Sequence, residues 1–169
     1  YSSTLRQVLE AAAEADIPLL VLDRADPYMN WLDGPMHDPV CAGFVNAIPT
    51  PLVYGMTSGE LASFLVDELH LDVDLSVIPC QGLSRRENLP VADILRHPPS
   101  PSIRTAAAAL AYPLTVLFEA LPAFDHGRTT NTPFQLLGAP GLPAEALAER
   151  LQDVPGLTVC PVTYSTQTG

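Results

Sequence analysis

The chain has 169 residues, 47% of them hydrophobic, and its 19 Asp and Glu against 8 Lys and Arg give a formal net charge of −11. This length suits one domain or two small ones, with enough apolar residues for a buried core. So few basic residues argue against a nucleic acid partner. No apolar run approaches the roughly 20 residues that a membrane-spanning helix needs, so we expect no membrane span.

The chain opens on Tyr1-Ser2-Ser3, without an initiator Met or the pattern of a signal peptide. We therefore expect it to be an internal piece of a longer protein. Its localisation stays open, since a cytoplasmic, periplasmic or secreted protein would all fit. The cysteines are odd in number and far apart, which argues against a disulfide framework or a zinc site. We expect Cys41, Cys80 and Cys160 to be small buried hydrophobes.

Residues 4–15 are predicted to form a helix, because their apolar residues recur on one face. Thr4 and Gln7 have the spacing of a capping box at its start. Residues 18–23 are a short apolar run that ends in charge, which predicts a buried parallel strand.

Two further elements complete the first half of the chain. Residues 57–71 have helical periodicity, and residues 74–79 predict a second strand. A helix–strand–loop–helix–strand order is typical of an α/β fold with a parallel sheet.

The second half begins with a polar, Pro-rich segment, residues 84–102, which we interpret as a connection at a domain boundary. The apolar residues 105–121 predict either one helix kinked at Pro113 or two short helices. Further along, we expect a strand, a short helix with Pro at its first turn, and a last strand, over residues 133–137, 143–151 and 157–162.

The start of the second predicted helix is the first candidate binding site. Thr57 and Glu60 have capping-box spacing and follow a turn at Gly55, which accounts for them without any function. Alternatively, the helix N-terminus presents free backbone N–H groups to an anionic or polar ligand.

Asp23 and Arg24 stand where the first predicted strand ends. Open α/β sheets bind ligands at the carboxyl ends of their strands, although a salt bridge that ties down the loop would explain the pair equally well. Asp26-Pro27 and Asp33-Gly34-Pro35 read as turns. Trp31 lies between them and fits a sugar-stacking platform or, alternatively, a plug in the core.

Glu119 and Arg128 are the candidates in the second half. Glu119 ends an apolar run, and apolar surroundings raise the pKa of a carboxyl group, which suits a general acid. A helix-terminal Glu that reaches solvent is the alternative. Arg128 follows Asp125 and His126 in a Gly-containing loop and has the planar fork that binds a carboxylate. No dinucleotide-binding, phosphate-loop or esterase-elbow motif is present.

Several segments, in this order, resemble the bacterial DUF1343 family, which is associated with exo-β-N-acetylmuramidases. The segments are Leu22-Asp23-Arg24-Ala25-Asp26-Pro27, Gly55-Met56-Thr57-Ser58-Gly59-Glu60-Leu61, Pro98-Pro99-Ser100-Pro101-Ser102, Leu117-Phe118-Glu119 and Gly127-Arg128-Thr129-Thr130. The resemblance covers the middle to C-terminal portion of the family.

The resemblance implies the tail of a Rossmann-like domain over residues 1–80, a smaller α/β domain over 81–169, and a site in a cleft between them. It implies release of non-reducing-end N-acetylmuramic acid from peptidoglycan fragments, without metal or organic cofactor. The implied catalytic residue is Glu119. The implied substrate-binding residues are Asp23, Arg24, Thr57, Glu60, Arg128 and Thr129.

The chain also departs from the family pattern. The family usually continues Glu-Gly-Thr-Asn, whereas this chain has Glu119-Ala120-Leu121. The family segment expected to hold another catalytic Glu would precede Tyr1. A non-catalytic sugar-binding or structural relative is therefore a second hypothesis. An unrelated nucleotide-dependent Rossmann-type enzyme is a third, and the absence of phosphate-loop glycines counts against it.

Overall fold

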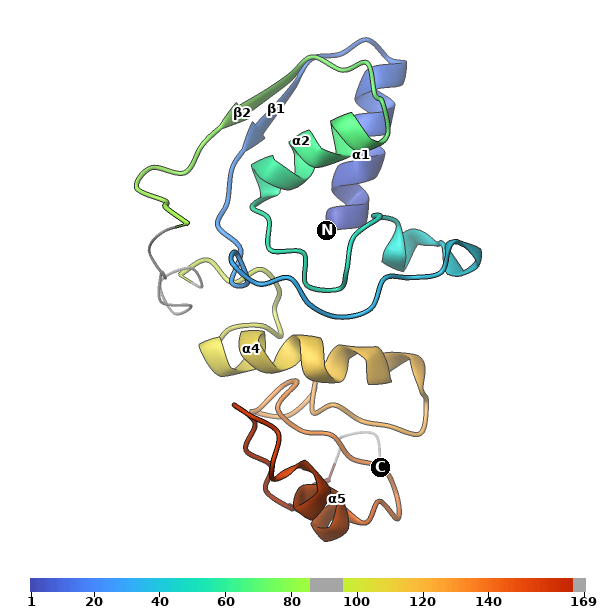
Figure 1. Ribbon diagram of the computed structural model, residues 1–169, viewed down its shortest axis with the longest axis vertical. Coiled ribbons are helices and arrows are strands. Elements are labelled where there is room, and N and C mark those ends of the chain that lie inside the picture. The colour runs from blue at the N-terminus through green and yellow to red at the C-terminus, as the bar shows by residue number, and fades with distance from the viewer. Residues whose placement is uncertain (86–95, 166–169) are drawn as a thin grey trace. The chain divides into compact units, whose positions relative to one another are not determined.

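The computed structural model describes residues 1–85 and 96–165. The chain forms two compact units, unit 1 over residues 1–97 and unit 2 over residues 98–169 (Figure 1). Most of the predicted connection over residues 84–102 lies outside the described residues. The domain boundary expected after residue 80 stays a prediction.

Unit 1 contains a β–α–β arrangement with a further helix before it. Its elements are α1 (Ser2–Glu14), β1 (Leu19–Leu22), η1 (Pro39–Cys41), η2 (Phe44–Asn46), α2 (Ser58–Glu68) and β2 (Leu75–Ile78). The two strands pair in parallel, with Leu19 opposite Leu75 and Leu22 opposite Ile78. The predicted α/β order with a parallel sheet is confirmed.

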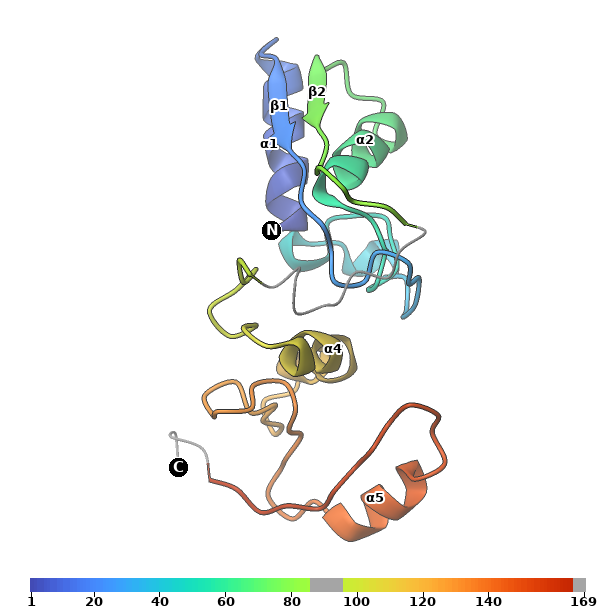
Figure 2. The ribbon, with the colours of Figure 1, turned by 90° about the vertical axis from the view of Figure 1, so that its left-hand side faces the viewer.

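The core of unit 1 lies between the sheet and the two long helices. Leu9 of α1 and Leu61 and Leu65 of α2 are buried, and Leu19 and Val21 of β1 pack against them. Figures 1 and 2 show both helices on the same side of the sheet. Alternate strand residues therefore carry the packing, as the period of two in a strand requires.

The other face of the sheet is open within the part of the chain that the structure describes. Leu20, Leu22 and Ile78 point to this face and are 58%, 71% and 51% exposed. The expectation that residues 18–23 form a buried strand is thus wrong within residues 1–85 and 96–165, because the two helices cover one face of the sheet alone.

Three smaller expectations about unit 1 and the cysteines are corrected. Helix α1 begins at Ser2 without a side-chain cap, so Thr4 lies inside the first turn and forms no capping box with Gln7. Cys41 and Cys160 are exposed and Cys80 is partly buried, so the cysteines are not core residues. None of the described helices combines the length and apolar character that crossing a membrane requires.

The regular elements of unit 2, within the described residues 98–165, are helices joined by turns and irregular segments. It contains α4 (Ala106–Thr115), η3 (Val116–Ala120) and α5 (Ala144–Leu151). The Thr105 hydroxyl caps α4 by accepting the Ala108 N–H at 3.1 Å. Pro113 lies inside α4, which passes directly into the 3-10 helix η3. The helical structure predicted for residues 105–121 is confirmed, as an α-helix that contains Pro113 and continues into a 3-10 helix.

The two strands predicted in unit 2, over residues 133–137 and 157–162, are absent from the described structure. Phe134 adopts a left-handed backbone with φ of 64°, which interrupts an extended strand. Its buried ring packs edge-on against Tyr112 with centroids 4.9 Å apart and lies 5.1 Å from the ring of His126. This aromatic packing holds a conformation that strand propensity does not anticipate.

Candidate functional site

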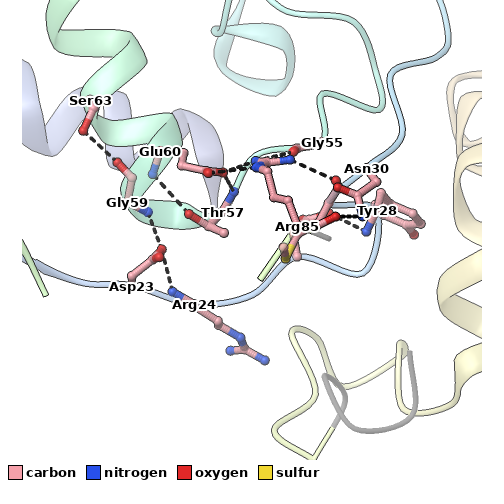
Figure 3. A network of polar contacts seen from close by, with 12 residues as sticks. Asp23, Arg24, Tyr28, Asn30, Gly55, Thr57, Gly59, Glu60, Ser63 and Arg85 are labelled. Atoms are coloured by element: carbon pink, nitrogen blue, oxygen red, sulfur yellow. Dashed lines mark hydrogen bonds and ion pairs between the residues drawn. The ribbon is translucent and has the colours of Figure 1, made fainter. Parts of the chain in front are cut away.

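In unit 1, the carboxyl ends of β1 and β2 meet the N-terminus of α2 around a pocket of about 470 Å³. Of the predicted site residues, Asp23, Thr57 and Glu60 line this pocket (Figure 3). The Arg24 guanidinium instead donates a hydrogen bond to the carbonyl of His97. The remaining pocket-lining residues are Gly59, Ser63, Val77, Pro79, Cys80, Leu83 and Arg85.

The capping box at the start of α2 is confirmed. The Glu60 N–H donates to Thr57 Oγ1 at 3.2 Å, and the Thr57 N–H donates to Glu60 Oε2 at 2.8 Å. The two N–H groups between them are also occupied, since Ser58 donates to the Arg24 carbonyl and Gly59 to Asp23 Oδ1. The helix end therefore offers none of these four N–H groups to an anion, and the structural interpretation of Thr57 and Glu60 accounts for their contacts.

Replacing Thr57 with alanine is expected to lower the free energy of unfolding by about 1 kcal/mol, because an N-cap hydroxyl is lost. Sugar affinity should stay unchanged, because the Thr57 backbone N–H and Arg85 still hold the Glu60 carboxylate when the hydroxyl is removed. Thr105→Ala removes a comparable N-cap in unit 2 and is the matched control. Urea unfolding and sugar titration of both variants measure the two effects. A large affinity loss in Thr57→Ala with an unchanged melting temperature would instead make Thr57 a ligand contact.

Asp23 ties the end of β1 to α2. Its Oδ1 accepts the Gly59 N–H at 2.7 Å and the Arg24 N–H at 2.8 Å. The expected alternative, a salt bridge with the Arg24 side chain, is replaced by these backbone contacts. A Cβ on Gly59 would lie 2.5 Å from Val77 Cγ1 and 3.0 Å from Asp23 Oδ1, so glycine permits the close approach. Within the described residues, Asp23 Oδ2 accepts no hydrogen bond and remains available to a ligand.

Arg85 is the functional candidate that sequence reasoning missed. Its guanidinium forms a two-point ion pair with Glu60, with Nε 3.0 Å from Oε1 and Nη2 bonded to Oε2 (Figure 3). It also donates to the carbonyls of Gly55, at 2.9 Å, and Met29, at 3.1 Å. The available signal was its position after β2, which brings it to the edge of the sheet where Asp23 also lies.

Two carboxyl groups of unit 1 have pKa values shifted in opposite directions. Partial burial raises the pKa of Glu60, but hydrogen bonds from Arg85 and the Thr57 N–H, together with the Arg85 charge, outweigh it and lower the pKa overall. Burial raises the pKa of Asp26, and a 2.7 Å hydrogen bond from the Tyr28 N–H opposes this only in part. Glu60 is therefore held as an acceptor, and Asp26 forms the predicted turn.

Trp31 lies at the surface, and its backbone is next to the Gly55 turn. Its side chain is 55% exposed, and its ring centroid is 6.3 Å from that of Tyr28 at an interplanar angle of 38°. The core-plug alternative is therefore wrong. The backbone below is fixed by paired hydrogen bonds between Asp33 and Val53, so the ring stands on an ordered loop.

In unit 2, Glu119 and Arg128 form an ion pair, with Nη1 3.1 Å from Oε1. Their side chains are 52% and 59% exposed, so the apolar surroundings expected for Glu119 are wrong. Glu119 lies in the terminal 3-10 turn, where it reaches solvent. Only Nη1 of Arg128 has a partner within the described residues, which leaves Nε and Nη2 available. Thr129 is exposed beside Arg128.

The loop that carries Arg128 is fixed by Asp125. Asp125 Oδ1 accepts the Gly127 N–H at 2.8 Å and the Tyr164 hydroxyl at 2.9 Å. Thr130 closes the turn by donating its hydroxyl to the Gly127 carbonyl at 2.7 Å. Burial, the hydrogen bond to Asp125 and the Asp125 charge raise the pKa of Tyr164 to about 12. Tyr164 thus acts as a neutral donor that fastens the loop.

Replacing Tyr164 with phenylalanine is expected to lower the free energy of unfolding by about 1 kcal/mol, because its hydroxyl donates to Asp125. A raised pKa gives stability that is fully present below the unfolded-state value of 10.0 and is lost as pH rises through about 12. The difference between wild type and variant should therefore be constant at neutral pH and shrink above pH 10.

Urea unfolding of unit 2 across this pH range measures the effect. Tyr1→Phe is the control, because Tyr1 is 88% exposed. A stability difference that does not change between neutral pH and pH 12 would contradict the role given to the Tyr164 hydroxyl.

No group of three or more His, Cys, Asp or Glu in the described ranges is arranged to hold a metal ion.

The chain matches two family models. Residues 1–107 match the N-terminal model of the exo-beta-N-acetylmuramidase NamZ, and residues 110–169 match its C-terminal model.

Known proteins give the same picture. A protein of Bacillus subtilis (strain 168), named peptidoglycan beta-N-acetylmuramidase NamZ, is 39% identical over 164 residues. The match covers 94% of this chain and 39% of that relative, so the chain spans well under half of its length. Crystal structures of two DUF1343 family proteins from Bacteroides fragilis NCTC 9343 are also similar. They have TM-scores of 0.73 and 0.79 at 35% and 31% identity, and the matches cover 83% and 90% of this chain and 39% and 40% of theirs.

Proposed function

Since the chain belongs to the exo-β-N-acetylmuramidase NamZ family, we propose that the protein carrying it hydrolyses peptidoglycan fragments and releases non-reducing-end N-acetylmuramic acid. The observation that carries the proposal is 39% identity over 164 residues to a protein named as a peptidoglycan beta-N-acetylmuramidase. Both halves of the chain match the family, so the likeness is not confined to one motif.

Arg128 is the proposed contact for the carboxylate of the substrate. N-acetylmuramic acid carries this group on its lactyl ether, and a guanidinium binds a carboxylate through two parallel hydrogen bonds. Nε and Nη2 of Arg128 have no partner among the described residues, and the side chain is 59% exposed. Thr129, exposed next to it, adds a hydroxyl to the same proposed site.

The pocket of unit 1 is the proposed contact for sugar hydroxyl groups. Asp23 and Glu60 bring two carboxylates to it, and Arg85 neutralises Glu60. The remaining negative charge disfavours a carboxylate ligand and favours a hydroxyl donor to Asp23 Oδ2. In this proposal the Glu60 carboxylate shapes the pocket, held by the backbone N–H of Thr57, and Arg24 holds its loop through His97.

Glu119 is our candidate for one of the two carboxylates that glycoside hydrolysis usually requires. Its carboxylate is exposed and lies 3.1 Å from the guanidinium of Arg128. The proposed substrate would thus meet a carboxylate next to the group that holds its own carboxylate. No metal or organic cofactor enters this mechanism.

A non-catalytic sugar-binding relative is the second candidate. Ala120 and Leu121 follow Glu119 and are exposed, at a position where the family usually has polar residues. Such a protein would still bind N-acetylmuramic acid through Arg128 but would not turn it over. The nucleotide-dependent alternative has no support in the family match.

The test compares two chromogenic substrates that differ in the lactyl ether. The protein is expected to release N-acetylmuramic acid from a β-N-acetylmuramide and to leave the corresponding β-N-acetylglucosaminide intact. Equal hydrolysis of the two substrates would contradict the proposal. Binding of N-acetylmuramic acid without hydrolysis of either substrate would favour the non-catalytic candidate.

A further inference from the structure

We propose that Arg85 is a positioning residue of the unit 1 pocket, which fixes the Glu60 carboxylate and joins the segments that surround it. The inference rests on the proposed function of this pocket as a sugar site. Arg85 contacts three segments that are far apart in sequence. They are the loop after β1 through Met29, the turn before α2 through Gly55, and α2 itself through Glu60.

The contacts use the geometry of arginine specifically. The guanidinium presents Nε and Nη2 together to the two oxygens of Glu60, while Nη1 and Nη2 donate to backbone carbonyls. A lysine ammonium cannot reproduce this planar fork. The backbone of Arg85 is held as well, because the Asn30 side-chain amide donates to the Arg85 carbonyl at 3.2 Å. Arg85 is therefore held on both its side chain and its backbone.

The position of this pair distinguishes it from an ordinary surface ion pair. Both side chains are 43% exposed, and both line the pocket. Glu60 Oε2 accepts hydrogen bonds from Arg85 and from the Thr57 N–H, so the same oxygen connects Arg85 to the helix end. Both oxygens of Glu60 thus accept hydrogen bonds from the protein, whereas within the described residues Asp23 Oδ2 accepts none and is open to a sugar hydroxyl.

Arg85 affects the position of Asp23 indirectly, through the N-terminal turn of α2. Asp23 accepts the Gly59 N–H one residue before Glu60, so the orientation of the helix end sets where Asp23 lies. Loss of the fork would release Glu60, the Gly55 turn and the Met29 loop together. We therefore expect Arg85 to affect sugar binding without touching the reacting atoms.

The test compares Arg85→Lys with Arg6→Lys. Arg6 is a matched control in the same unit, because it also pairs with a glutamate, Glu10, and donates to a backbone carbonyl, that of Ala47, but does not line the pocket. Arg85→Lys is expected to weaken N-acetylmuramic acid binding about tenfold, the factor that corresponds to 1.4 kcal/mol. Arg6→Lys should leave the affinity unchanged at a similar shift in melting temperature.

A double-mutant cycle tests whether Arg85 acts through Glu60. In a Glu60→Gln background, Arg85→Lys should weaken binding by clearly less than in the wild type. Equal effects in both backgrounds would overturn the inference. So would wild-type affinity in Arg85→Lys, or an equal loss of affinity in Arg6→Lys.

Amide hydrogen exchange supplies a measurement that needs no ligand. The Thr57 N–H, which donates to Glu60, should exchange about tenfold faster in Arg85→Lys and at the wild-type rate in Arg6→Lys. If the wild type bound no N-acetylmuramic acid, the proposed function would fail, and Thr57 exchange would still decide whether Arg85 positions Glu60. Unchanged exchange in Arg85→Lys would reject the positioning role.

Discussion

Replacing Gly55 with alanine is expected to lower the free energy of unfolding of unit 1 by about 3 kcal/mol. Gly55 has a φ of +63°, a left-handed conformation that costs other residues about 1–2 kcal/mol. A Cβ there would overlap the Trp31 carbonyl oxygen and lie 3.3 Å from the carbonyl carbon. These are backbone atoms, which cannot rotate away, and overpacking of this kind adds about 1–3 kcal/mol.

Gly82→Ala separates the two contributions. Gly82 is also in unit 1 with a φ of +71°, but an added Cβ would meet nothing within 4 Å. This variant should show the backbone strain alone, about 1 kcal/mol. Urea unfolding followed by circular dichroism compares the two proteins. Equal destabilisation would mean that the backbone at Trp31 shifts to accommodate a Cβ at Gly55 without a measurable cost in free energy of unfolding.

The same contact explains why the Gly55 turn matters for the site. The Gly55 carbonyl accepts a hydrogen bond from Arg85, and a Cβ added to Gly55 would meet the backbone of Trp31. The turn therefore joins the exposed ring of Trp31 to the pocket-lining Glu60–Arg85 pair. We expect Gly55→Ala to weaken sugar binding even at temperatures where unit 1 remains folded.

Local patterns predicted the elements whose causes are local. The periodicity of residues 57–71 and the spacing of Thr57 and Glu60 predicted α2 and its capping box, because a helix and its cap depend on residues within one or two turns. The predicted strands, residues 18–23 and 74–79, extend one residue beyond β1 and β2 at each end. The order helix–strand–loop–helix–strand was sufficient to predict that the two strands pair in parallel.

The missed features depend on contacts between distant residues. Arg85 bonds to Glu60 and Met29, which lie far before it in the chain, so no local pattern marks it. Strand propensity failed over residues 133–137 because the packing of Phe134 against Tyr112 imposes a left-handed backbone. Glu119 follows an apolar run, yet the 3-10 turn exposes it to Arg128.

Glu119→Gln and Arg128→Lys are expected to separate turnover from binding in the proposed hydrolase. Because their ion pair is exposed, it stabilises unit 2 by at most about 1 kcal/mol, and both variants should remain folded. Glu119→Gln keeps the shape but removes the carboxylate, so kcat should fall about 100-fold or more if Glu119 is one of the two carboxylates that hydrolysis requires.

Arg128→Lys keeps the charge but removes the fork. It should weaken N-acetylmuramic acid binding by about 1.5 kcal/mol or more, the net value of a charge-assisted hydrogen bond, with a smaller effect on kcat. Glu149→Gln removes an exposed carboxylate of α5 in the same unit and is the control for the negative charge lost in Glu119→Gln. If Glu119 served only to orient Arg128, both site variants would weaken binding alike and kcat would hardly change. That outcome would remove Glu119 from the chemistry and keep Arg128 as the carboxylate contact.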